Sequence, residues 1–281
     1  MTGSKGQIGS ALRRALAPLG DLVATSRADL DLLAPGAVER RIAQERPDVI
    51  VNAAAYTGVD RAERERELAF RVNAEAVGRI GRAAADCGAL VVHFSTDYVF
   101  DGEKPAPYVE SDPARPLGVY GASKLAGERA LGESGCRHFI FRTSWVYGPR
   151  GRNFLLAILA AARTQPELRV VDDQHGAPTS SRAIAEATAQ ALAAADLAEK
   201  PGGVYHLSAA GRTTWCGFAR LIVERAGMKL PVVAIRSVEY PVAVRRPANS
   251  LLDNSKIVRT FGIVLRDWRE DVPAAVAATI G

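Results

Sequence analysis

Tyr120 and Lys124 form the pair of residues whose types and spacing point most directly to chemistry. Four residues make about one helical turn, so the phenol and the ammonium would share one face of a helix. A neighbouring positive charge favours phenolate and lowers a tyrosine pKa that is ordinarily about 10. Such a tyrosine can give a proton to a carbonyl oxygen. Thr96, at the expected end of a strand, would offer its hydroxyl to the same oxygen.

Short apolar segments alternate with helical patterns in the first half of the chain and would position these side chains. We predict strands over 22–25, 48–52, 90–95 and 138–143, and helices over 8–19, 36–45, 67–87 and 119–132. Short buried strands separated by helices are typical of an α/β fold with a Rossmann-like, doubly wound parallel sheet. Ligands bind such sheets beyond the carboxyl ends of the strands, which is where Thr96 would lie.

The pattern of elements changes after about residue 148, which predicts a second, smaller part of the molecule. We expect residues 1–148 to form a dinucleotide-binding domain, to which residues 180–210 return. Residues 149–179 and 211–281 would then form a C-terminal lobe that binds the substrate and closes over the strand ends.

Charge and composition exclude several classes of function. The net charge is +5, but acidic residues interleave with most of the scattered arginines. This pattern predicts solvated helix faces and no nucleic-acid partner, while a mild positive excess suits an anionic small substrate. The longest apolar run, 155–162, is far too short for a membrane span, and we expect no membrane partner and no signal peptide.

Cysteine and histidine usage indicates the compartment and argues against a metal. The three cysteines, Cys87, Cys136 and Cys216, are odd in number and far apart, which favours reduced thiols in a cytoplasmic protein. The four histidines show none of the spacings of a metal site, so we predict no metal.

Gly3, Gly6 and Gly9 lie three residues apart, directly before a predicted helix. Small residues let the backbone approach a pyrophosphate, and the helix N-terminus favours the anion, so this loop predicts a dinucleotide site that includes Gln7 and Ile8. Such a loop ordinarily follows a buried strand, yet only Met1 and Thr2 precede it. We therefore expect either a start further upstream or a sheet that lacks its first strand and leaves backbone groups unpaired.

Arg27 follows the predicted second strand, at a place where an acid would bind a ribose 2′-hydroxyl. An arginine there suits a 2′-phosphate, so we predict NADPH as cofactor, with NADH as the alternative. Small residues after the strand 48–52, among them Ala54 and Ala55, would let the cofactor lie close. For the substrate we predict phosphate binding by Arg245 and Arg246 and further contacts from Asn153, Gln174 and Asn249.

Several strings of residues together resemble the extended short-chain dehydrogenase/reductase superfamily, and within it the dTDP-4-dehydrorhamnose reductases. The strings lie in order along the whole chain, and the most specific are Ser-Thr-Asp-Tyr-Val-Phe at 95–100 and Arg-Thr-Ser-Trp-Val-Tyr at 142–147. The resemblance implies reduction of the 4-keto group of dTDP-4-dehydro-L-rhamnose, or of a closely similar nucleotide 4-keto-6-deoxysugar, by NAD(P)H.

The resemblance also implies roles for individual residues. Tyr120 resembles the catalytic acid, Lys124 the lysine that holds the nicotinamide ribose and acidifies that tyrosine, and Thr96 the hydroxyl on the keto oxygen. Asp97 and Trp145 resemble residues that contact the sugar. Positions that resemble the family's dinucleotide site are Gly3, Gly6, Gly9, Asp31, Leu32, Ala54, Ala55 and Thr57.

The two departures from the family are the missing first strand and Ala11, and two alternatives remain open. Some members hold Mg²⁺ at a dimer interface through a glutamate, where this chain has Ala11, so we predict a monomer or a weak homodimer. Tyr98 stands where a 4,6-dehydratase has glutamate, which argues against dehydration. The alternatives are a nucleotide-sugar 4-epimerase of the same superfamily and a non-catalytic subunit that resembles methionine adenosyltransferase β.

Overall fold

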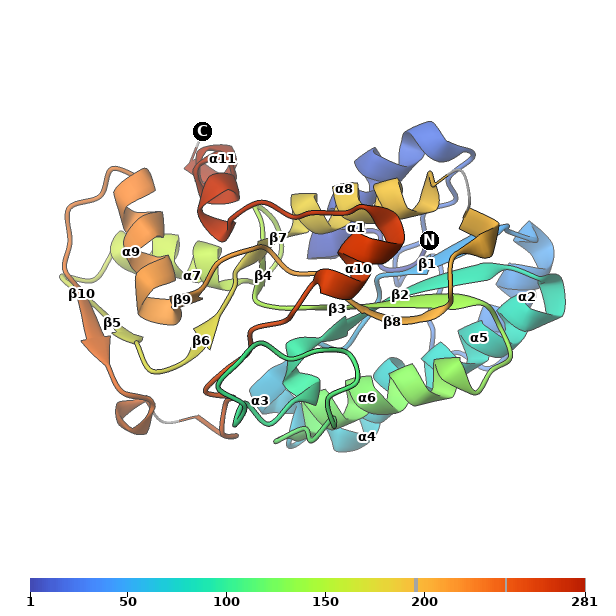
Figure 1. Ribbon diagram of the computed structural model, residues 1–281, viewed down its shortest axis with the longest axis horizontal. Helices are drawn as coiled ribbons and strands as arrows, with labels where there is room; N and C mark the ends of the chain where they lie inside the picture. The colour runs from blue at the N-terminus through green and yellow to red at the C-terminus, as the bar shows by residue number, and fades with distance from the viewer. Residues whose placement is uncertain (195–196, 241, 281) are drawn as a thin grey trace.

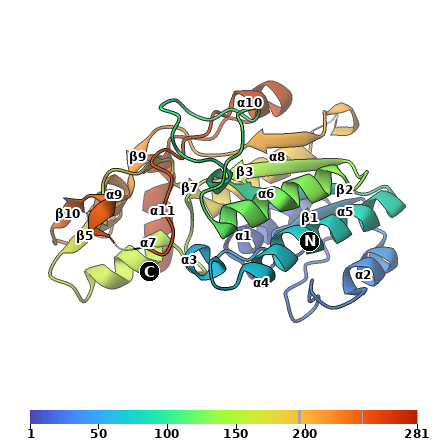
Figure 2. The same cartoon turned by 90° about the horizontal axis from the view of Figure 1, so that it is seen from below.

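The computed structural model describes residues 1–194, 197–240 and 242–280. A parallel sheet lies between two layers of helices, and a smaller lobe lies beside it, at the left of Figure 1. Figure 2 shows the same division from below. Positions 195, 196, 241 and 281, which belong to the predicted domain ranges, lie outside the described residues.

The central sheet has four parallel strands in the order β1 (Val49–Asn52), β2 (Leu90–Thr96), β3 (His138–Thr143) and β8 (Gly203–His206). All seven residues of β2 are buried, as an apolar strand covered on both faces should be. The strands predicted over 48–52, 90–95 and 138–143 are confirmed to within a residue. The fold class, a Rossmann-like doubly wound parallel sheet, is confirmed.

The strand predicted over 22–25 is wrong, because this segment forms no ladder. The first residues of the chain lie between it and β1, with single hydrogen bonds from Thr2 N–H to the Val51 carbonyl and from Thr25 N–H to the Met1 carbonyl. Ser4 N–H donates to the Thr25 carbonyl. Bonds this few fix the position of the segment without making it a strand.

Helices cover both faces of the sheet. On one face α1 (Gln7–Leu16), followed by η1 (Ala17–Leu19), packs against α8 (Ser181–Leu192). On the other face lie α2 (Ala37–Glu45), α5 (Ala76–Cys87) and α6 (Val119–Gly132). Each face has its own apolar cluster, built on Phe139 and Phe141 on the first face and on Val91 and Ile140 on the second.

The helix predicted over 67–87 is divided into three pieces. These are α4 (Arg66–Phe70), a π-helical turn η2 (Arg71–Glu75) and α5, with the short α3 (Val59–Ala62) ahead of them. Asn73 lies in the π turn, and its side chain bonds the Tyr56 backbone and the Ser123 hydroxyl. Its carbonyl lies so close to Gly127 of α6 that a Cβ there would be nearer than 3.0 Å. The π turn thus holds α4 and α5 closely against α6.

The smaller lobe has its own apolar core, formed by α7 (Phe154–Ala162), α9 (Trp215–Arg225), α11 (Trp268–Ile280) and β5 (Leu168–Val171). β10 (Val232–Ile235) pairs with β5 in parallel. Two-residue ladders near the junction pair β4 (Val146–Tyr147) with β7 (Thr179–Ser180) and β6 (His175–Gly176) with β9 (Thr213–Thr214).

The remaining elements are short turns and one helix between the strands and helices described above. They are the 3₁₀ turns η3 (Asp97–Val99), η4 (Leu197–Glu199) and η5 (Ser237–Glu239), and the helix α10 (Ser255–Phe261). Ile257 of α10 belongs to the apolar cluster of the sheet, together with Ile263 and Leu265. In the part of the chain that the structure describes, no helix is long and apolar enough to cross a membrane.

Candidate active site

Tyr120 lies in the first turn of α6, beyond the carboxyl end of β2. The strand ends at Thr96, whose hydroxyl hydrogen-bonds Tyr120, and the chain then turns through η3. The Tyr98 ring meets the Tyr120 ring edge-on, with centroids 5.9 Å apart. Gly121 allows this approach, because a Cβ there would lie closer than 3.0 Å to the Tyr98 carbonyl oxygen. The predicted tyrosine and threonine hydroxyls are therefore together at the strand end.

The predicted influence of Lys124 on Tyr120 is wrong for this structure. Burial raises the pKa of Tyr120 to about 12, the hydrogen bond from Thr96 lowers it, and the charge of Asp97 raises it. Lys124 is not among the causes, because its side chain turns inward to contact His93 and the Phe94 carbonyl. The phenol therefore stays protonated through the neutral range.

Lys124 is itself almost completely buried, with 2% of its surface exposed. Its Nζ donates to the Phe94 carbonyl at 2.6 Å and lies 3.1 Å from His93 Nε2. Burial lowers its pKa to about 8, and the charge of Glu128, one turn further along α6, raises it. Glu128 is paired with Arg142 at 2.6 Å in a buried ion pair, so Lys124 has no carboxylate of its own.

Asp97 is a buried carboxyl group beside the same hydroxyls. Its Oδ1 accepts from Thr96 Oγ1 at 2.9 Å, and its Oδ2 has no hydrogen-bond partner within the described residues. Burial raises its pKa to about 7, although hydrogen bonds from Thr96 and Ser250 lower it. This carboxyl group therefore changes protonation close to neutral pH.

We expect Asp97→Asn to stabilise the protein at alkaline pH but not at acidic pH. Between about pH 4 and pH 7 the unfolded chain loses the Asp97 proton while the folded chain keeps it, so the free energy of unfolding falls over this window. Asparagine does not titrate, so the variant should gain on the order of a few kcal/mol near pH 8, and the gain should vanish near pH 4. Urea unfolding at several pH values measures this, with the exposed Asp21→Asn as control.

A gain for Asp97→Asn that is equal at all pH values would contradict a buried, proton-holding carboxyl group. An equal pH dependence in Asp21→Asn would assign the effect to general charge instead.

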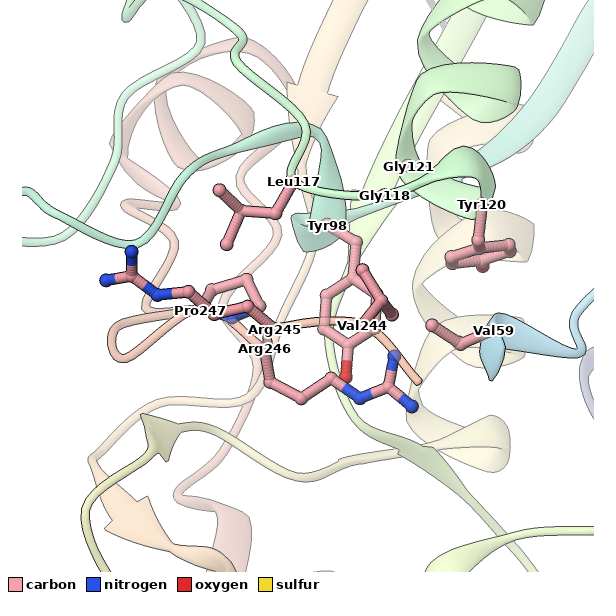
Figure 3. A pocket seen from close by; sticks show the side chains of 10 residues that line it. All are labelled: Val59, Tyr98, Leu117, Gly118, Tyr120, Gly121, Val244, Arg245, Arg246 and Pro247. Carbon is pink, nitrogen blue, oxygen red and sulfur yellow. The ribbon is translucent and has the colours of Figure 1, made fainter. Parts of the chain in front are cut away.

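A small cavity next to Tyr120 is lined by residues from both parts of the molecule (Figure 3). Val59 and Tyr98 come from the sheet domain, and Val244 and Arg246 come from the C-terminal segment. The Arg246 guanidinium lies 5.9 Å from the centre of the Tyr98 ring and bonds Asp60 at 2.6 Å. Arg245 is exposed, and its side chain points the opposite way in Figure 3. Both predicted arginines line the cavity, and the Arg246 guanidinium is the one that lies against the Tyr98 ring.

The predicted glycine loop has the shape that a dinucleotide requires. Gly3 has φ of +68°, and a Cβ there would lie 2.6 Å from the backbone of Ala53 and Ala54. Gly9 packs so closely on the Gly3 carbonyl that any Cβ would collide with it. This loop contacts Ala54, which lies directly after β1. The start of α1 therefore lies beside the carboxyl end of β1. Residues without side chains leave the backbone N–H groups accessible to a pyrophosphate, so the site fits that group.

The other predicted cofactor residues differ in how their side chains are placed. Arg27, Ala55 and Thr57 are exposed, whereas Leu32 and Ile8 pack into the two sheet cores. Gln7 bonds the Arg152 carbonyl, and Asp31 accepts from Leu33 N–H. The acid nearest the end of segment 22–25 is Asp29, whose carboxylate holds Ser26 N–H and Oγ.

Trp145 and Gln174 form part of one wall of the smaller lobe. Trp145 has φ of +47°, which is rare outside glycine, and its ring stacks on Trp215 with centroids 3.5 Å apart. Trp215 Nε1 donates to Gln174 Oε1, and Gln174 Nε2 donates to Ser237 Oγ. The stack and these bonds hold the strained backbone of Trp145 in place.

Two predicted substrate residues have their side-chain amides occupied by the fold. Asn153 caps α7 by accepting from Leu156 N–H, and it donates to the Gly148 and Arg150 carbonyls. Asn249 donates to the Lys104 and Ala106 carbonyls and accepts from Leu251 N–H. The structure thus gives both side-chain amides a structural role.

Sequence reasoning missed several residues of the site. Tyr98 enters the sequence prediction only as an argument against dehydration, although its place two residues after Thr96 indicates a position at the strand end. Trp215 offered the weak signal of a rare aromatic residue. Asp60 and His93 offered none, because only folding brings them to Arg246 and Lys124. Within the described ranges, no group of three or more His, Cys, Asp or Glu residues could hold a metal ion.

Comparison with known proteins identifies relatives over nearly the full chain. The family model described as the RmlD substrate binding domain matches residues 1–280. A protein of Burkholderia thailandensis named dTDP-4-dehydrorhamnose reductase is 47% identical over 98% of this chain and 97% of its own. A solved dTDP-4-dehydrorhamnose reductase from Clostridium acetobutylicum is 33% identical, with a TM-score of 0.93 over 98% of this chain and 97% of its own. One from Bacillus anthracis, solved with NADP, is 34% identical, with a TM-score of 0.92 and the same two coverages.

Proposed function

Because this chain belongs to the RmlD substrate binding domain family, we propose that it is an NAD(P)H-dependent oxidoreductase. Its reaction is reduction of the 4-keto group of dTDP-4-dehydro-L-rhamnose to dTDP-L-rhamnose, or of a closely similar nucleotide 4-keto-6-deoxysugar. The relatives at high coverage carry that name, and one of them holds NADP in its structure. The observation that carries the proposal is the pair of hydrogen-bonded hydroxyls of Thr96 and Tyr120 at the strand edge beside the glycine loop.

The proposed chemistry places one proton and one hydrogen bond at the keto oxygen. Bound NADPH supplies the hydride, and negative charge then develops on that oxygen. Tyr120, protonated through the neutral range, donates its proton there, while the Thr96 hydroxyl stabilises the same oxygen. In the ligand-free structure the Thr96 hydroxyl donates its single proton to Asp97 Oδ1, so it would turn from that oxygen to the keto oxygen when the substrate binds. Lys124 lies one turn after Tyr120 on the same helix, and its Nζ would have to leave His93 and the Phe94 carbonyl to reach the cofactor ribose.

We assign the cofactor to the loop Gly3–Gly9, with Ala54, Ala55 and Thr57 along the end of β1. The exposed guanidinium of Arg27 is free of any ion pair within the described residues and suits a 2′-phosphate, which supports NADPH as the donor. Asp31 and Leu32 would line the other end of the cofactor, mainly through their backbone.

The nucleotide sugar would lie between the two parts of the molecule. Arg246 is the proposed diphosphate ligand, since arginine binds phosphate through two donors. Trp145, which follows β3 and stacks on Trp215 of the lobe, and Gln174 of the lobe would contact the sugar. This assignment corresponds to a dinucleotide-binding part, 1–148 with 180–210, and a substrate lobe, 149–179 and 211–281, with α10 packed back on the sheet. Ala11 leaves the proposed state as a monomer or weak homodimer.

The test is a panel of 4-keto nucleotide sugars incubated with NADPH and, separately, with NADH. We expect stoichiometric loss of the reduced-nicotinamide absorbance with the dTDP-4-keto-6-deoxy sugar, and a single configuration at C4 of the product. Isomerisation without net consumption of NADPH would indicate an epimerase. Tight binding to a methionine adenosyltransferase, with no turnover of any keto sugar, would indicate a regulatory subunit.

Asp60 occupies the guanidinium that we assign to the diphosphate, so Asp60→Asn should improve substrate binding. The ion pair is partly exposed, with 14% of the Arg246 side chain and 48% of the Asp60 side chain accessible. Pairs of this kind are worth about 0.2–1 kcal/mol, so KM for the nucleotide sugar should fall by up to about fivefold. Steady-state kinetics at saturating NADPH measures this change.

Two further variants test the assignment of Arg246. Arg246→Gln should raise KM for the sugar, whereas Arg245→Gln, at the exposed neighbour whose side chain points away, should leave it nearly unchanged. If both arginine variants raise KM equally, the choice of Arg246 as the diphosphate ligand is wrong.

A further inference from the structure

A continuous line of buried hydrogen bonds runs through the sheet from the cofactor edge to Lys124. Ala54 N–H donates to Asn52 Oδ1 at 3.3 Å, and Asn52 Nδ2 lies 3.1 Å from His93 Nδ1. His93 Nε2 lies 3.1 Å from Lys124 Nζ, which donates to the Phe94 carbonyl at 2.6 Å. Asn52, His93 and Lys124 are each at most 2% exposed. Water therefore cannot reach these three side chains and replace their hydrogen bonds.

The direction of each hydrogen bond follows from its fixed end. Two donors, Ala54 N–H and the Thr2 hydroxyl, meet Asn52 Oδ1, so the Asn52 amide nitrogen must face His93. That nitrogen can only donate, and His93 Nδ1 must therefore present its lone pair. Complete burial is the largest cause that lowers the pKa of His93 well below its ordinary value, so the ring is neutral. A neutral ring that accepts at Nδ1 carries its proton at Nε2.

This tautomer has a consequence for Lys124. The Nε2–H of His93 points at Nζ, where an ammonium would present a second donor and an amine would present a lone pair. The remaining polar contact of Nζ, the Phe94 carbonyl, is satisfied by an amine N–H as well. An ammonium that donates to His93 needs the ring proton at Nδ1 and the Asn52 amide turned over. The turned amide would set its N–H₂ against Ala54 N–H.

The charged groups around this line of hydrogen bonds do not outweigh its preference for an uncharged Lys124. On α6, Glu128 favours the ammonium but is bonded to Arg142 of β3 and to Ser95 of β2. On β3, the charge of His138 lowers the pKa of His93 further. Tyr120, also on α6, is protonated in the neutral range. β1 contributes only the uncharged Asn52.

We propose that His93, oriented by Asn52, is a positioning residue for Lys124 that fixes Nζ beneath the active site and favours its uncharged form. This inference rests on the proposed function for the catalytic importance of Lys124, but the hydrogen-bond arrangement stands apart from it. Asn52 controls this arrangement, because its side-chain amide determines which ring nitrogen of His93 carries the proton.

Asn52→Asp tests the proposal by reversing that choice without a change of shape. A carboxylate accepts from Nδ1–H, so Nε2 presents its lone pair to Nζ and the ammonium is favoured by both the hydrogen bond and the added charge. We expect the pKa of Lys124 to rise by at least about one unit. The lysine Cε signals of the ligand-free protein, followed by NMR against pH, measure it, with the other five lysines as internal controls.

The ring-nitrogen signals of the same sample report the tautomer directly. We expect His93 with its proton at Nε2 in the natural chain and at Nδ1 in Asn52→Asp, with His93→Gln used to assign the signals. A natural chain with the His93 proton at Nδ1, or a Lys124 pKa that Asn52→Asp leaves unmoved, would overturn the proposal. Neither reading depends on turnover, so a chain with the expected tautomer and no activity on any keto sugar would refute only the proposed function.

Kinetics separates positioning from a general structural role. His93→Leu removes the contact to Nζ, whereas His93→Gln keeps a side-chain N–H at the place of Nε2. We expect His93→Leu to raise KM for NADPH and lower kcat while KM for the sugar stays unchanged, and His93→Gln to restore most of both. Equal losses in Leu and Gln variants would contradict positioning.

Discussion

Tyr120→Phe should lower kcat by about 10²–10⁴-fold while leaving the fold intact, because general acid catalysis is typically worth that factor. The phenol is the group with a transferable proton that the structure places against the Thr96 hydroxyl, and its pKa of about 12 keeps it protonated. Phenylalanine keeps the edge-on ring contact to Tyr98 and removes only the hydroxyl. Single-turnover reduction of the keto sugar with NADPH measures the chemical step.

Tyr98→Phe is the matched control for this prediction. Its ring lines the same cavity and is half-buried like that of Tyr120, and burial also raises the pKa of its hydroxyl. We expect that variant to retain kcat within a few-fold. Comparable losses in both variants would mean that the cavity needs its hydroxyls for binding, and full activity of Tyr120→Phe would remove Tyr120 from the role of proton donor.

Gly121→Ala should be the most damaging small substitution near the site. Its Cβ would lie closer than 3.0 Å to the Tyr98 carbonyl oxygen, a backbone atom that cannot move without shifting η3. Forced overpacking of this kind costs about 1–3 kcal/mol, occasionally more. The shift would also separate Tyr120 from Thr96, so kcat should fall together with the free energy of unfolding. Urea unfolding and steady-state kinetics on the same preparation measure the two effects.

The other end of the same helix supplies the control. Gly132 is the last residue of α6, and a Cβ there would meet nothing within 4 Å. Gly132→Ala should leave activity unchanged and stabilise the protein by up to about 1 kcal/mol, because alanine loses less backbone entropy than glycine on folding. Similar behaviour of the two variants would show that the contact between α6 and η3 is looser than the structure has it.

The sequence predicted an element correctly wherever the residues of that segment alone determine its structure. The run at 90–95 is apolar enough to be buried on both faces and is therefore recognisable as a central strand. The spacing of Gly3, Gly6 and Gly9 predicted a loop that the structure closes against Ala53 and Ala54. The segment 22–25 has the same apolar appearance but no ladder, because a strand depends on neighbours that its own sequence does not encode.

The sequence by itself determined the α/β class, the family resemblance and the hydroxyl groups that could transfer a proton. Those follow from residue types and short spacings, which are local properties. Tertiary structure alone decided that Lys124 contacts His93 instead of Tyr120, that Arg246 is held by Asp60, and that the amides of Asn153 and Asn249 serve the fold. Protonation, ion pairing and satisfied hydrogen bonds depend on burial and on partners far away in the chain, and these exist only once the sheet and the lobe have packed together.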